Sequence, residues 1–127
     1  MITTGDVLTT CGSHNERLDW VSPAVERNAS ETAAKVTLLL MKFGASRKLT
    51  SGFRDLDSNR RSGGAPYSKH LYGQAADIED KDGRLAQWIT KELLTDFGLW
   101  MEDPAHTTGW VHVQVVPPLL GARVFVP

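Results

Sequence analysis

The chain has 127 residues, of which 41% are hydrophobic and 23% are charged, as expected for one globular domain with a single core. The net charge of −1 gives no overall field that would attract nucleic acid or an anionic membrane, and the single cysteine, Cys11, excludes an intrachain disulfide. The longest largely apolar run, 36–41, is far shorter than the roughly 20 residues that a membrane-spanning helix needs. We expect a monomer that binds neither nucleic acid nor membrane.

Helices and strands are expected to alternate along the chain. Before residue 22 no periodicity predicts an element. Ser22 and Pro23 then have the residue types of a helix start, apolar residues recur at three- and four-residue steps as far as Phe43, and Gly44 is a suitable stop. A second helix is expected over 82–97, and a long loop over 55–68. Strands are expected over 49–54, 74–79, 99–102, 110–116 and 122–126. This order predicts an α+β domain spanning 1–127, in which a small antiparallel sheet packs against helices.

Two histidines and an aspartate are placed so that they can meet on this sheet. Alternation in 110–116 puts three valines on the core face, so His112 points the other way. Asp77 lies in an apolar strand, where a buried charge needs a partner. Gly73 allows a turn that folds His70 back over Asp77. Two imidazoles and one carboxylate form the ligand set of a catalytic zinc ion, which leaves a fourth position for water.

Each of these residues also has a simpler interpretation. His70 lies in a loop rich in serine and lysine, where most histidines are surface residues. Asp77 can form an ordinary salt bridge, and His112 can be a histidine on the solvated face of a strand. The spacing alone leaves both interpretations open.

The surrounding motifs resemble a known family. The runs Ser51-Gly52-Phe53-Arg54, Ser68-x-His70-x-x-Gly73-x-Ala75-x-Asp77 and Trp110-x-His112-x-Gln114 are similar to those of the zinc D-alanyl-D-alanine peptidases, which cut peptidoglycan stem peptides. These enzymes share their fold with the Hedgehog signalling domain. The resemblance covers residues 51–114 and implies a Hedgehog/DD-peptidase-like fold.

The resemblance implies roles for individual residues. It makes His70, Asp77 and His112 the ligands of Zn²⁺, and Arg54 the cation next to the scissile carbonyl. A salt bridge from Arg54 to Asp55, Asp57 or Asp77 is the alternative. The contacts expected for a stem peptide come from the following four residues: Ser68, Tyr72, Trp110 and Gln114. For Ser68, a hydrogen bond within its own turn is an equal alternative.

The general base is where the chain departs from the family pattern. Many relatives carry an acid three positions before the last histidine ligand, and this chain has Gly109 there. Glu102 is the predicted base, with His106 and then Asp103 as alternatives. The missing acid also favours a second hypothesis, a zinc-stabilised binding module of the same fold without activity.

The resemblance implies a phage or prophage lysis enzyme, either a carboxypeptidase or an endopeptidase. Residues 1–6 have neither the basic nor the apolar character of a secretory signal. We therefore expect the protein to be made in the cytoplasm and to act on the cell wall after release.

Overall fold

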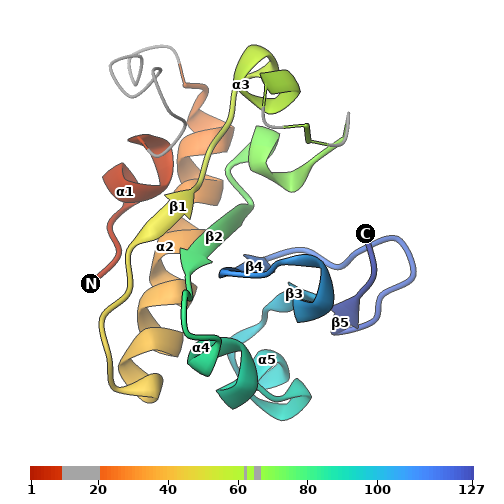
Figure 1. Cartoon of the computed structure of the whole chain (residues 1–127). Helices are drawn as coiled ribbons and strands as arrows, with labels where there is room; N and C mark the ends of the chain where they lie inside the picture. The colour runs from red at the N-terminus through yellow and green to blue at the C-terminus, as the bar shows by residue number, and fades with distance from the viewer. Residues whose placement is uncertain (10–20, 62, 65–66) are drawn as a thin grey trace.

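The computed structural model describes residues 1–9, 21–61, 63–64 and 67–127. A five-stranded sheet in the order β1-β2-β4-β3-β5 carries helices on and around it, and the long helix α2 lies behind the strands in Figure 1. The predicted α+β class with a small, mostly antiparallel sheet is confirmed. The helices and strands are α1 (Thr4–Thr9), α2 (Pro23–Phe43), β1 (Leu49–Ser51), α3 (Leu56–Arg61), η3 (Lys69–Tyr72), β2 (Ala75–Glu79), α4 (Arg84–Trp88), α5 (Lys91–Phe97), β3 (Trp100–Glu102), η4 (Pro104–His106), β4 (Trp110–Gln114) and β5 (Val124–Phe125).

Helix α2 forms where the sequence predicts it. The Ser22 hydroxyl accepts the Val25 N–H at 3.2 Å, Pro23 occupies the first turn, and Gly44 ends the helix with φ of 87°. The buried side of α2 supplies much of the core, including the fully buried Val36 and Leu39. The helix therefore covers one face of the sheet and leaves the other face for the site.

The register of the two central strands sets the geometry of that other face. Strands β2 and β4 pair antiparallel, with Asp77 directly opposite His112. Ile78 and Val111, also opposite each other, are buried in the core. The predicted alternation is correct in both strands, so Asp77 and His112 share the face away from the core.

Several predicted boundaries were wrong. The helix expected over 82–97 is two helices, because Ile89 is extended (φ −68°, ψ 127°) and the Thr90 hydroxyl starts α5 by accepting the Leu93 N–H. The loop expected over 55–68 contains α3. Positions 62 and 65–66 of this loop lie outside the described residues. Strand β1 ends at Ser51 with a register irregularity.

Two further differences concern the ends of the chain. Helix α1 was not anticipated, and the strand expected over 122–126 is the short β5, which pairs parallel with β3. Among the helices of the described ranges, none has the length and apolarity needed to cross a membrane.

Candidate metal centre

Three side chains from separate elements converge on the face of the sheet that points away from the core. His70 is on η3, Asp77 on β2 and His112 on β4, and one ligand atom from each lies within 4.8 Å of the others. Asp77 Oδ1 is the common point, 3.2 Å from His70 Nε2 and 2.9 Å from His112 Nδ1. This arrangement places two imidazole nitrogens and a carboxylate oxygen where one ion can bind all three.

The turn before β2 brings His70 into place. The Ser68 hydroxyl caps η3 by accepting the His70 N–H at 3.2 Å. Gly73 ends η3 with φ of 71°, and a Cβ there would lie 2.9 Å from the Val25 carbonyl oxygen. Glycine is therefore required both by the backbone conformation and by the close approach of α2.

In each imidazole, the nitrogen that points away from Asp77 has its own hydrogen-bond partner. These partners determine which nitrogen carries the hydrogen and which has the lone pair. His70 Nδ1 lies 2.6 Å from the Gly52 carbonyl oxygen, which can only accept, so Nδ1 carries the hydrogen. His112 Nε2 lies 2.9 Å from Gln114 Oε1, and Gln114 directs this oxygen by donating from Nε2 to the Val116 carbonyl at 3.0 Å. In the neutral rings assigned from these partners, both nitrogens facing Asp77 carry lone pairs. Three atoms with lone pairs directed at one point repel one another unless a cation or a proton lies between them. These three ligand atoms therefore fit a metal ion.

The pKa shifts agree with this arrangement. Burial opposes ionisation of Asp77, but the close contacts with the His112 and His70 imidazoles outweigh it and hold the Asp77 pKa well below its usual range. Burial lowers the pKa of His70, which favours the neutral ligand form. Burial also opposes protonation of His112, but the Asp77 carboxylate raises its pKa overall. A metal ion must therefore displace a proton that His112 shares with Asp77.

Arg54 contacts the same aspartate from the other side. Its Nη2 lies 3.3 Å from Asp77 Oδ2, its Nε donates to Ser51 Oγ at 3.0 Å, and its Nη1 donates to Asn59 Oδ1 at 3.4 Å. The salt bridge to Asp77 that the sequence left open is thus formed. It leaves Oδ1 directed at the histidines while Oδ2 is held by the guanidinium.

An open cleft of about 740 Å³ lies over the three convergent side chains. Of the predicted site residues, it brings together the following: Arg54, Ser68, Trp110, Gln114, Glu102 and His106. Tyr72 is not among the described residues that line it; this side chain is 43% exposed, and its carbonyl accepts a hydrogen bond from Asn28 on α2. The expected substrate contact from Tyr72 therefore finds no support in its position.

Glu102 is the acid that the structure places beside the three convergent side chains. Strand β3 pairs with β4 so that Met101 lies opposite Val113, and the next residue, Glu102, falls beside His112. Partial burial raises the Glu102 pKa, the Asp77 charge adds to this, and His112 opposes it. A half-buried carboxyl of raised pKa on the wall of a cleft has the properties of a general base or acid.

The alternatives for the base are less well placed. His106 lines the cleft, but from the exposed 3-10 helix η4. The Asp103 carboxylate caps η4 by accepting the Ala105 N–H at 3.0 Å. Gly109 has φ of 93°, and an aspartate or glutamate at this position would have a strained backbone.

Some residues of the site were not anticipated. Phe125 packs edge-on against His112, with ring centroids 6.1 Å apart, and lines the cleft together with Leu119 and Val126. Its position depends on the parallel pairing of β5 with β3, for which the local sequence holds no signal. Gln114 was expected to contact substrate, yet it is only 3% exposed and bonds to His112.

The sequence of the chain matches a family of known proteins. A family model described as Peptidase M15 matches residues 2–114, a range that includes the three convergent residues and Glu102. No curated protein matches the chain.

Proposed function

Because the chain belongs to the peptidase M15 family, whose zinc-dependent members act on peptidoglycan, we propose that His70, Asp77 and His112 hold the zinc ion of a stem-peptide hydrolase. The observation that carries this proposal is the convergence of two imidazole nitrogens on Asp77 Oδ1, each ring held from behind by a hydrogen bond. Zinc bound there would lower the pKa of a water molecule and polarise the substrate carbonyl.

The remaining chemistry falls to residues on the walls of the cleft. Glu102 is proposed to take the proton of the attacking water and to deliver it to the leaving amine, a role that its raised pKa suits. Arg54 is proposed to stabilise the developing oxyanion from its fixed position beside Asp77. His106 is the alternative proton carrier, because it lines the same cleft.

Substrate contacts are proposed from two of the residues expected to supply them. Trp110 is 37% exposed and lines the cleft, so its ring can pack against the peptide. Ser68 also lines the cleft, although its hydroxyl already caps η3. Gln114 is better suited to orienting His112 than to binding substrate.

The experiment that tests the proposal combines metal analysis with digestion of purified peptidoglycan. We expect one zinc per chain, release of cleaved stem peptides, loss of this activity with a chelator, and its recovery with zinc. Mass spectrometry of the products would distinguish a carboxypeptidase from an endopeptidase. One equivalent of zinc without cleavage of any stem peptide would instead favour the inactive binding module.

The biological setting is a further proposal that rests on the family resemblance. We infer a phage or prophage lysis enzyme that acts on the wall as a monomer after release from the cytoplasm. Lysis of cells in which the protein is co-expressed with a membrane-permeabilising partner, and no lysis by a variant lacking His112, would support this role. Equal lysis by both proteins would contradict it.

A further inference from the structure

The sheet face that carries the proposed metal ligands continues beyond them to a second cavity. Next to the Asp77–His112 pair, the register of β2 and β4 places Glu79 opposite Trp110. Side chains two residues apart on a strand share a face and are separated by about 7 Å. Trp110 lines the metal-centre cleft, whereas Glu79 lines a separate cavity of about 500 Å³. The two cavities are therefore neighbours along one face of the sheet.

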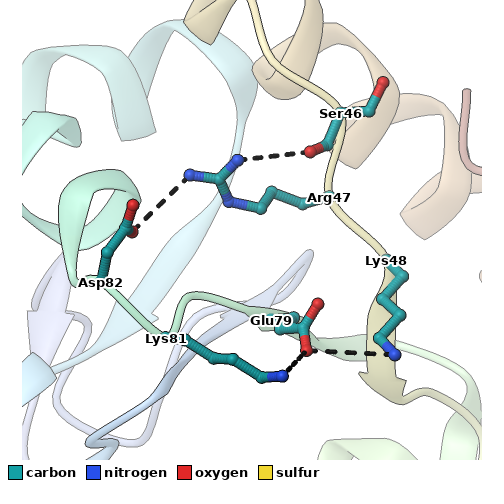
Figure 2. Close-up of a pocket in the computed structure, with 6 residues that line it drawn as sticks. All are labelled: Ser46, Arg47, Lys48, Glu79, Lys81 and Asp82. Carbon is teal, nitrogen blue, oxygen red and sulfur yellow. Dashed lines mark hydrogen bonds and ion pairs between the residues drawn. The ribbon is translucent and has the colours of Figure 1, made fainter.

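Charged side chains dominate this second cavity (Figure 2). Its described lining consists of Ser46, Arg47, Lys48, Glu79, Lys81 and Asp82. The Lys48 carbonyl accepts the Glu79 N–H at 2.9 Å, so these two residues lie opposite each other and their side chains share the cleft-side face. The amines of Lys48 and Lys81 lie 3.9 Å and 3.3 Å from the same oxygen, Glu79 Oε1. Two ammonium groups against one carboxylate leave an excess of positive charge.

The rest of the cavity does not cancel that excess. Arg47 lies 3.7 Å from Asp82 and stacks over the Phe43 ring, and Asp82 also lies 3.6 Å from Arg84, so this aspartate does not offset the lysines. The lysine side chains are 74% and 84% exposed, while Glu79 is 24% exposed beneath them. An approaching ligand therefore meets the ammonium groups before it meets the carboxylate.

We propose that this cavity is a substrate subsite in which Lys48 and Lys81 bind a free carboxylate of the peptide. The inference rests on the proposed function, because it takes the metal ligands as the place where the peptide bond is cut. Two residues of an extended peptide span about 7 Å. The Asp77–His112 pair and the Glu79–Trp110 pair are separated by the same distance along the strands. The carboxylate would thus belong to a residue about two positions from the cleaved bond.

The existing ion pairs favour this role. Exposed lysine–carboxylate pairs contribute little, so both amines can turn from Glu79 toward a substrate carboxylate. Glu79 keeps the two amines over the sheet in the absence of substrate, and Trp110, opposite Glu79 on β4, lines the metal-centre cleft. The structure accordingly assigns this face a preference for acidic over amidated stem peptides.

Binding of two matched peptides tests the proposal. The probes are synthetic stem pentapeptides that differ only in the glutamyl carboxylate, which is free in one and an amide in the other. Their affinities for the zinc-loaded full chain are measured by calorimetry at low and high salt. The test variant is Lys48→Gln/Lys81→Gln. The control, Lys42→Gln/Lys91→Gln, removes the same charge from exposed positions that line neither cavity.

We expect wild type and control to bind the acidic peptide about two- to fivefold more tightly than its amide, as an exposed ion pair can provide. The preference should shrink at high salt and vanish in the test variant. Equal affinities in wild type, no measurable binding of either peptide, or a full preference in the test variant would overturn the subsite.

Turnover of the same peptides is followed separately by mass spectrometry. Cleavage without any preference in binding would overturn the subsite and leave the peptidase proposal intact. A preference in binding without cleavage would leave the subsite intact and count against the peptidase.

Discussion

Replacing Gln114 by leucine tests whether this buried amide positions His112. The substitution keeps most of the side-chain volume and removes the oxygen that lies 2.9 Å from His112 Nε2. In the metal-free protein the buried N–H of His112 would lose its partner, which costs about 1–3 kcal/mol of unfolding free energy. Loss of such an outer hydrogen bond typically weakens metal affinity by about 10- to 100-fold, or roughly 1.4–2.8 kcal/mol.

Zinc affinity of Gln114→Leu is measured by competition with a chromophoric chelator, and unfolding by urea. Gln87→Leu on the exposed surface of α4 is the matched control and should change neither quantity. Gln114→Glu retains an acceptor for His112 and should recover most of the zinc affinity. If Gln114→Leu binds zinc like wild type but raises the KM for a stem peptide, Gln114 is a substrate contact and the positioning argument is wrong.

The remaining predictions concern the proposed base, the proposed metal-binding carboxylate and the cation beside it. Glu102→Gln should lower kcat by about 10²- to 10⁴-fold with zinc still bound at one equivalent, whereas His106→Gln should retain most activity; the reverse result in a peptidoglycan digestion assay would transfer the role to His106. Asp77→Asn should reduce the zinc content measured by elemental analysis, and stoichiometric zinc in this variant would remove Asp77 from the ligand set. The folded-state pKa of Asp77 is depressed, so its contribution to the stability of the metal-free protein is present above its unfolded pKa of about 4 and is lost as pH falls further. Urea unfolding across this acidic range should show that loss in wild type and a weaker one in Asp77→Asn; identical profiles would contradict it. Arg54→Lys should retain zinc but lower kcat/KM for a stem peptide, because an ammonium cannot reproduce three guanidinium contacts.

Local patterns in the sequence were sufficient for the parts of the fold that depend on neighbouring residues. The Ser22–Pro23 start and Gly44 stop of α2 follow from backbone and capping chemistry within a few residues. Alternation placed Asp77 and His112 away from the core, and the motif resemblance pointed to the three convergent residues before any contact was known. The sequence also identified Glu102 as a candidate without showing where its side chain lies.

The tertiary structure decided whatever depends on pairing between distant segments. The β2–β4 register sets Asp77 against His112, and the antiparallel β3–β4 and parallel β3–β5 pairings bring Glu102 and Phe125 beside them. Strand register arises from the whole hydrophobic arrangement and not from any single strand, so local sequence cannot specify it. The hydrogen bonds that select the ring nitrogens, from His70 to the Gly52 carbonyl oxygen and from His112 to Gln114 Oε1, likewise exist only once these segments meet. The sequence therefore identified the residue types that could bind a metal. Only the folded sheet brings both imidazoles to Asp77 Oδ1.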